Sequence, residues 1–163
     1  NWIDPGLLFL ENTYRILEEH GRMGIVLSNS IASIDRWKKA RKWLVSNMRI
    51  VALFDLPSNI FADTGVNTTI IVAYKPTSKE LEKLKQQDYE VFTKKINNIG
   101  YEVRTSKRVK YYNPIYKINP VTFDVEIDEK GNPILEEDFT NTISDFKDWC
   151  LSQEKTLSDL FVK

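Results

Sequence analysis

The residue types that most often do catalytic chemistry are scarce in this chain of 163 residues, which has one histidine and one cysteine. A Ser-His-Asp or Cys-His centre would have to use His20, at the end of a predicted helix, where a solvated side chain is the more common situation. A structural zinc site usually takes four Cys and His ligands, which His20 and Cys150 cannot supply. The residues therefore argue against a nucleophilic hydrolase and against a zinc protein.

Spacing argues against two other kinds of site. The acidic residues from Asp124 to Glu129 do not fall in the order that an EF-hand calcium loop requires, so a hairpin turn is the better interpretation. The six glycines are scattered, and they form neither G-x-G-x-x-G nor G-x-x-x-x-G-K-[ST]. We therefore expect no metal site and no self-contained nucleotide cradle.

A polar loop leads into one of the most apolar segments of the chain. Residues 61–76 read FADTGVNTTIIVAYKP, so Asp63, Thr64 and Asn67 stand just before a run that is typical of a buried strand. Polar residues at a strand end can contact a ligand, but Gly65 and Asn67 are also common in plain tight turns. The residues alone leave both interpretations open.

Ser28 and Asn29 follow a second apolar run, Met23 to Leu27. Open α/β sheets place their clefts at the ends of strands, which makes these two residues candidates for a cleft. Capping of the next helix is the alternative, and it is the more common role of Ser and Asn at such a position.

A basic segment lies in the second half of the chain. Residues 104–117 contain five cations, three tyrosines and no acid, whereas residues 124–148 contain nine acids and only two lysines. Cations can neutralise phosphates and tyrosines can stack on bases, so Lys107, Arg108 and Lys110 are candidates for contacts to a DNA backbone. A solvated strand face with core tyrosines is the alternative, which the charge pattern alone favours.

Local signals place helices and strands along the chain. Asp4-Pro5 is typical of a helix start and Gly21 of a helix end, and Thr77 with Glu80 forms a capping-box pattern. Up to residue 76, the expected elements are a helix from residue 5, a strand at 23–27, a helix through Ile34, Trp37, Ala40 and Leu44, and strands at 50–54 and 69–74. After residue 76, they are a helix at 77–87, strand-like residues 89–112 with a turn at Gly100, and a strand-turn-strand at 123–135. A last helix carries Phe139, Ile143, Phe146 and Cys150 on one stripe.

Short apolar strands that alternate with helices predict a layered α/β sheet with parallel members. The connection over residues 55–68 is either a short crossover to a parallel neighbour or an antiparallel turn-back. Composition fits a single globular domain, with 42% hydrophobic residues, 28% charged residues and a formal net charge of zero.

Localisation signals are few. No apolar run approaches the ~20 residues of a membrane span, and nothing resembles a signal peptide. The lone Cys150 fits a reducing, cytoplasmic compartment. The chain opens on Asn1 rather than on Met, so one interpretation is that it is a fragment of a longer protein.

One short match is misleading. Residues 113–116, Asn-Pro-Ile-Tyr, resemble the Asn-Pro-Pro-Tyr tetrapeptide with which amino-group DNA methyltransferases hold the target amine and stack on the flipped base. Ile115 replaces the second proline, and the tetrapeptide follows the strand at 69–74, whereas in that family it precedes the corresponding part. We interpret this match as a coincidence.

Longer segments carry a more specific resemblance. LFLENTYRILEEHGRMGIVLSNS, at residues 8–30, and ARKWLVSNMRIVALFDLPSNIFADTGVNTTIIVAYKP, at 40–76, are similar to the second half of an N6-adenine DNA methyltransferase domain. The nearest variety is the modification subunit of type I restriction-modification systems and its relatives. The resemblance implies the C-terminal half of a Rossmann-like, S-adenosylmethionine (SAM)-dependent α/β sheet with flanking helices at residues 1–76, and a small α+β extension at 77–163.

The resemblance also implies a function for the longer protein. It would transfer a methyl group from SAM to the N6 atom of adenine in DNA, with the SAM loop and the Asn-Pro-Pro-aromatic motif upstream of this chain. The chain alone would then bind no cofactor and be catalytically inert. Phe61 would form one wall for a flipped adenine, with Asp63, Thr64 and Asn67 shaping the loop, unless Phe61 is a core anchor.

Partners follow from the same resemblance. They are DNA, a DNA-specificity subunit and a restriction subunit, with no membrane. A second hypothesis is that the chain mainly docks a specificity subunit through its acidic C-terminal region and last helix, without catalysis of its own.

Overall fold

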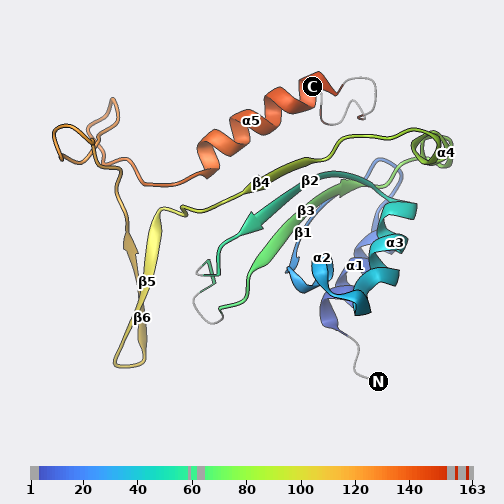
Figure 1. The fold of residues 1–163 in the computed structure, drawn as a ribbon, viewed down its shortest axis with the longest axis horizontal. Helices are drawn as coiled ribbons and strands as arrows, with labels where there is room; N and C mark the ends of the chain where they lie inside the picture. The colour runs from blue at the N-terminus through green and yellow to red at the C-terminus, as the bar shows by residue number, and fades with distance from the viewer. Residues whose placement is uncertain (1–3, 59, 62–64, 154–156, 158–160, 162–163) are drawn as a thin grey trace.

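The computed structural model describes residues 4–58, 60–61, 65–153, 157 and 161 (Figure 1). It shows the predicted mixed α/β architecture, in which helices flank a four-stranded sheet of order β1-β3-β2-β4 and a separate two-stranded ribbon, β5-β6, follows. The elements in chain order are α1 (Pro5–Ile16), β1 (Arg22–Ser28), α2 (Ser30–Ser33), the 3-10 turn η1 (Asp35–Trp37), α3 (Lys38–Asn47), β2 (Arg49–Leu56), β3 (Thr68–Tyr74), α4 (Ser78–Gln86), β4 (Phe92–Lys95), β5 (Tyr101–Ser106), β6 (Val109–Pro114) and α5 (Phe139–Ser152).

Helix α1 starts as predicted but ends early. The Asp4 side chain accepts a hydrogen bond from the Gly6 amide at 2.8 Å, and Pro5 occupies the first helical position. Gly21 is not the C-cap: the helix ends at Ile16, and Leu17 is already extended. The Lys75 ammonium explains this end, because it donates to the carbonyl of Leu17 at 2.8 Å and thereby satisfies a group that the helix leaves open.

The second predicted helix is interrupted. Ile34 is extended and separates the short α2 from η1 and α3. Arg41 supports the interruption, because its Nη1 donates to the carbonyls of Ile31 at 2.7 Å and Ile34 at 2.9 Å. Trp37 and Leu44 are nonetheless buried, as the apolar stripe predicted.

The sheet settles the connection that the sequence left open. Strand β3 lies between β1 and β2 and is antiparallel to both, so the connection from β2 to β3 is a turn-back and not a crossover. Strand β4 pairs parallel to β2, which supplies the expected parallel members. Strand β1 is an edge strand whose neighbour within the described part of the sheet is β3. Because β4 belongs to the same sheet, the domain boundary at residue 76 stays a prediction.

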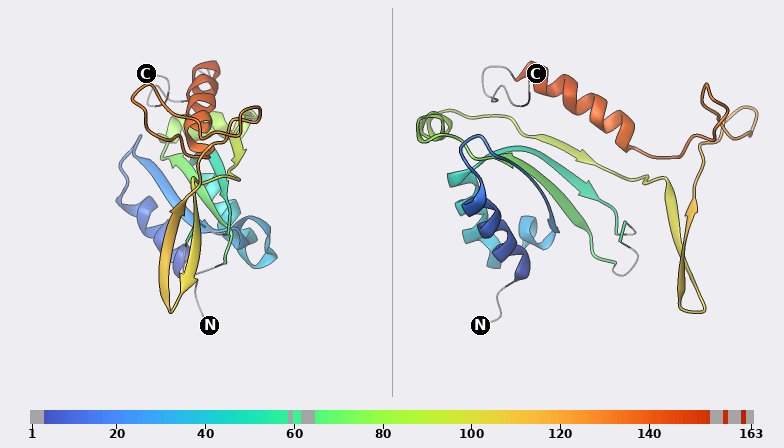
Figure 2. Two further views of the ribbon diagram at one scale, coloured as in Figure 1. Left: turned by 90° about the vertical axis from the view of Figure 1, so that its left-hand side faces the viewer. Right: turned by 180° about the vertical axis from the view of Figure 1, so that it is seen from behind.

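Helices cover the two faces of the sheet unequally (Figure 2). On one face, side chains of β1, β2 and β3 pack with α1 and α3 in the largest core cluster, which includes Leu10, Met23, Leu44, Ile50 and Ile71. On the other face Val51 and Tyr74 pack with Cys150 of α5, and Phe146 packs against them. Ile143, also predicted on the buried stripe of α5, is 53% exposed because the helix lies along the sheet rather than being enclosed by it.

The second half of the chain is less compact. The capping box of α4 is confirmed, with Thr77 and Glu80 each accepting from the other's backbone amide. Gly100 turns with a φ of 81° before the ribbon, as predicted.

The predicted strands at 123–135 are reduced to isolated bridges around a turn in which the Asp128 carboxylate accepts from the amides of Lys130 and Asn132. Among the described residues, no helix is long and apolar enough to cross a membrane.

Candidate functional site

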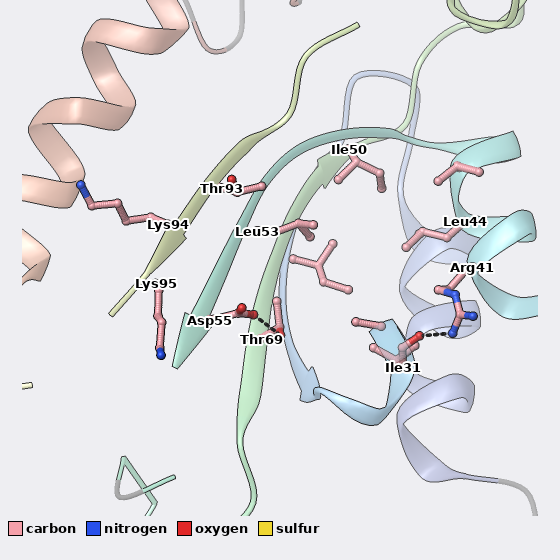
Figure 3. A pocket seen from close by; sticks show the side chains of 13 residues that line it. Ile31, Arg41, Leu44, Ile50, Leu53, Asp55, Thr69, Thr93, Lys94 and Lys95 are labelled. Atoms are coloured by element: carbon pink, nitrogen blue, oxygen red, sulfur yellow. Dashed lines mark hydrogen bonds between the residues drawn. The ribbon is translucent and has the colours of Figure 1, made fainter. Parts of the chain in front are cut away.

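Three polar side chains meet where β1 and β2 end and β3 begins. The Thr69 hydroxyl lies 2.8 Å from Oδ1 of Asp55 (Figure 3) and also 2.6 Å from Oδ1 of Asn29. Asp55 and Thr69 are direct partners across the β2-β3 ladder, so the register itself brings them together. We call Asn29, Asp55 and Thr69 the edge cluster.

The number of protons available in the edge cluster decides which group donates in each hydrogen bond. A hydroxyl has one proton to donate and accepts through its lone pairs, so Thr69 cannot donate to both neighbours at once. A charged Asp55 accepts only, and Thr69 therefore donates to Asp55. The Asn29 amide must then turn its NH₂ group toward the Thr69 oxygen, an orientation that the hydrogen-bond network decides. The result is a directional chain from Asn29 through Thr69 to Asp55.

The two cleft candidates from the sequence lie in this region. Asn29 occupies the N-cap position of α2, but its side chain makes no capping hydrogen bond and contacts Thr69 instead. Its backbone amide donates to the carbonyl of Asn67 at 3.0 Å, which joins the polar loop to the end of β1. Ser28 accepts from the amide of Ser30 at 3.3 Å, a local turn contact. The structure thus brings together Ser28, Asn29 and Asn67.

Phe61 is on the surface of the same loop. Its side chain is 42% exposed, whereas the preceding Ile60 packs against the buried cluster of Leu56, Ile96 and Ile99. The role of core anchor therefore belongs to Ile60. Asp63 and Thr64, the other two loop candidates, lie outside the described residues.

The loop is also tied to the ribbon. The Tyr101 hydroxyl, at the start of β5, donates to the Ile60 carbonyl at 2.9 Å. Tyr101 itself packs against the cluster that holds Ile60. The residue next to Phe61 is therefore fixed from two sides, by apolar packing and by a hydrogen bond.

A pocket of about 530 Å³ opens beside the edge cluster (Figure 3). Its interior is apolar, with side chains from α2, α3, β2 and β3, and its polar lining residues are Arg41, Asp55, Thr69, Thr93, Lys94 and Lys95. Lys94, on the neighbouring position of β4, reaches the other way and forms an ion pair with Asp145 of α5 at 2.7 Å. The pocket combines an apolar interior with several polar groups, as small-molecule sites do.

The remaining reactive side chains lie elsewhere. His20 is near the opposite end of β3, where its amide donates to the Lys75 carbonyl and its Nε2 lies 2.8 Å from Glu80. Burial raises the pKa of the Cys150 thiol, which packs between α5 and the sheet. Among the described residues, no three His, Cys, Asp or Glu side chains gather closely enough to hold a metal ion.

The sequence interpretation missed Asp55, Thr69 and Tyr101 as parts of this region. Asp55 reads as the end of a strand and Thr69 as the first residue of another. Their contact depends on the β2-β3 register, and the only available signal was two polar residues flanking a turn-back. Lys107, Arg108 and Lys110 do not join the edge cluster, since they lie on the ribbon. The misleading tetrapeptide spans the end of β6, where Asn113 pairs with Glu102 and not with the edge cluster.

A family model described as N-6 DNA Methylase matches residues 5–154 of this chain. A protein of Methanocaldococcus jannaschii, described as a type II restriction enzyme and methyltransferase, is 26% identical over 110 residues. That match covers 66% of this chain and 9% of the relative, so the chain spans less than a tenth of the length of this relative.

A solved structure is similar over nearly the whole chain. It comes from a study of complex assembly and conformational transition in a type I restriction-modification system, and its matching chain gives a TM-score of 0.51 at 18% identity. The match covers 96% of the present chain and 26% of the other. At this identity, the likeness supports the fold.

Proposed function

Because the chain belongs to the N-6 DNA methylase family, we propose that it is one part of a site-specific DNA adenine-N6 methyltransferase of a restriction-modification system. The longer protein transfers a methyl group from SAM to the exocyclic amine of adenine. In this proposal residues 1–76 belong to the methyltransferase domain and residues 77–163 form its extension. The chain spans a small share of its relatives, and in this proposal the groups that bind SAM and the target amine lie in the rest of the longer protein.

The described residues do not fit a SAM site. No glycine-rich turn follows a strand in this sequence, and the polar groups at the sheet edge are already hydrogen-bonded to one another. We therefore assign the cofactor to other parts of the longer protein, and the role of this chain is to shape the place of the target base.

The observation that carries the proposal is the exposed Phe61 on a loop that is fixed at its base. An extruded adenine needs an apolar or aromatic surface on which to stack. Phe61 offers that surface next to Ile60, whose carbonyl is bound by Tyr101 and whose side chain is packed in the core. Asn67, tied to Asn29 at the end of β1, closes the other side of the loop.

The remaining loop residues have supporting roles in this proposal. Asp63, Thr64 and Asn67 contact the target nucleotide or its phosphate. The edge cluster holds the ends of β1 and β2 against the start of β3, so both ends of the loop stay in place while the base enters. In the same proposal Ser28 and Asn29, at the end of β1, lie beside the place of the target base.

A second function has its own supporting observation. Residues 115–137, which we call the arm, expose large apolar side chains, among them Val121 at 82% and Phe123 at 79%. Such exposure is typical of protein interfaces. The arm and α5 would dock a DNA-specificity subunit, with a restriction subunit in the same cytoplasmic assembly.

The two functions can be separated with one pair of variants in the complete methyltransferase. For Phe61→Ala, we expect a loss of methyl transfer from labelled SAM of about 100-fold, since a misplaced base costs about that much. Binding of the specificity subunit should stay unchanged. Fluorescence of 2-aminopurine at the target position should show that extrusion of the base is impaired.

Phe123→Ala is the matched control, because it removes the same side chain from the arm. We expect it to leave base extrusion intact and to weaken subunit binding if the arm docks a partner. Full methylation by Phe61→Ala with normal 2-aminopurine fluorescence would refute the stacking role.

A further inference from the structure

The β5-β6 hairpin, which we call the ribbon, stands away from the sheet and its covering helices (Figures 1 and 2). Six residue pairs from Tyr101↔Pro114 to Ser106↔Val109 form a regular antiparallel ladder. At about 3.4 Å per residue, strands of this length extend roughly 20 Å. Tyr111 and Tyr112, on opposite faces, are 50% and 58% exposed, so neither face of the ribbon is covered.

The turn at the tip of the ribbon has residues that are unusual for its backbone conformation. Lys107 and Arg108 form the two-residue turn with φ values of 50° and 65°. A turn with both central residues in the left-handed region normally takes Asn-Gly, because other side chains are strained there. The chain instead places two exposed cations at its most protruding point. Strain of this kind is a reason to look for a function.

The charges of the ribbon fit a polyanion. Arg104, Lys107, Arg108 and Lys110 lie on the ribbon, and its one acid, Glu102, forms an ion pair with Arg104 at 2.8 Å. Nine acids lie beyond it, in residues 124–148. The net positive charge of the ribbon is therefore concentrated toward its tip, at Lys107, Arg108 and Lys110. An acidic surface would be needed opposite it, and duplex DNA presents one in the form of its phosphates.

The base of the ribbon is anchored beside the candidate base-binding loop. Tyr101 donates to the Ile60 carbonyl and also packs edge-on against Tyr112, with ring centroids 5.6 Å apart. This contact joins the first rung of the ribbon to the residue next to Phe61. A duplex that presents an extruded base to Phe61 therefore lies within reach of the ribbon.

We propose that the ribbon enters the major groove of DNA next to the target adenine, with Lys107 and Arg108 binding backbone phosphates. The major groove is about 12 Å wide and admits a two-stranded ribbon, whereas the minor groove is about half as wide. The proposal rests on the proposed function for the identity of the nucleic acid. It adds a contact that sets the register of the enzyme on its substrate.

The test uses the turn itself. In the complete methyltransferase, the double variant Lys107→Asn/Arg108→Gly removes both tip cations and gives the turn its preferred residues, so the hairpin stays folded. Binding to duplex DNA is measured without SAM over a range of salt concentrations. We expect the slope of log K against log salt to become shallower by about 1.8, which is 0.9 for each lost phosphate contact.

The matched control is Lys83→Gln/Lys85→Gln, which removes two exposed cations from α4, far from the ribbon (Figure 1). This control should leave the salt slope unchanged. Dimethyl sulfate footprinting reports the groove: the unmodified enzyme should protect guanine N7, a major-groove atom, and the turn variant should lose that protection.

Three results would overturn the inference: an unchanged salt slope, an equal effect of the control, or protection confined to adenine N3 in the minor groove. An unchanged slope together with weaker binding of another subunit would identify the ribbon as a protein contact. The proposed function is tested separately, since methyl transfer that depends on Phe61 can persist when the ribbon makes no groove contact.

Discussion

The region around the edge cluster, where β1 and β2 end, differs from the ribbon and the arm in how its polar and aromatic residues are used. At the edge, the buried Thr69 hydroxyl joins Asn29 to Asp55, and Ile60 is held by packing and by a hydrogen bond. In the ribbon and the arm, tyrosines, a phenylalanine and cations face solvent. The edge is prearranged by contacts within the chain, whereas the other region leaves its contacts to be made with something else.

This difference separates stability from recognition. Removal of a side chain at the edge should cost folding free energy, because its partners are part of the protein. Removal of an exposed apolar side chain from the arm should cost little, because that side chain is already largely in contact with solvent.

The largest effect is expected at Ile96, which is 1% exposed and joins β4 to the cluster under the loop. Ile96→Ala should lower the free energy of unfolding by about 2–5 kcal/mol through lost burial and the cavity that remains. Ile127→Ala in the arm, where the side chain is 62% exposed, should change it by no more than about 0.5 kcal/mol. Urea unfolding measures both, and equal losses would remove the contrast.

A smaller effect is expected from the edge cluster. Thr69→Val keeps the shape of the side chain but leaves Asn29 and Asp55 without their shared hydroxyl. The expected loss is about 1–2 kcal/mol, since the hydroxyl is buried while Asp55 can still reach water. Thr93→Val, on the exposed side of β4, is the control and should have almost no effect. A loss no larger than that of the control would mean that the edge cluster does not stabilise the fold.

The smallest effect concerns the start of α5. The backbone amides of Asn98 and Asn97 donate to Asp138 and hold the pKa of its carboxyl below the usual 3.8. A carboxyl with a depressed folded-state pKa stabilises the fold above its unfolded pKa, and this contribution is lost as the pH falls through the folded value. The effect should stay below about 1 kcal/mol, because the group is partly solvated.

The measurement for Asp138 is unfolding from neutral to acidic pH, for the unmodified chain and for Asp138→Asn. The stability difference between them should shrink as the pH falls. A constant difference would show that the charge of Asp138 plays no part.

Short-range signals predicted the parts of the fold that short-range contacts decide. The Asp4-Pro5 start and the capping box of Thr77 and Glu80 depend on residues a few positions apart, and both are present. The predicted end of α1 at Gly21 was wrong, because Lys75, far along the chain, binds the Leu17 carbonyl where the helix ends. The interruption at Ile34 likewise depends on Arg41, whose contacts no helix pattern contains.

For the candidate site, too, short-range signals found some residues and missed those that depend on long-range contacts. The sequence predicted Ser28, Asn29 and Asn67, because each flanks an apolar run. Asp55 and Thr69 were not, because their contact needs the register of two strands joined by a turn-back whose direction the sequence left open. The exposure of Phe61 required knowing that Ile60, and not Phe61, points into the core.

Strand β1 has a consequence for the handling of this polypeptide. Among the described residues β3 is the strand that pairs with it, so β1 lies at the edge of the sheet. An edge strand is a template on which another strand can pair. During purification of the separate polypeptide, folding therefore competes with association through the sheet edges of two molecules, and dilute solutions favour folding. The same edge is where a matching strand, supplied as a peptide or as a fused segment, would improve its solubility.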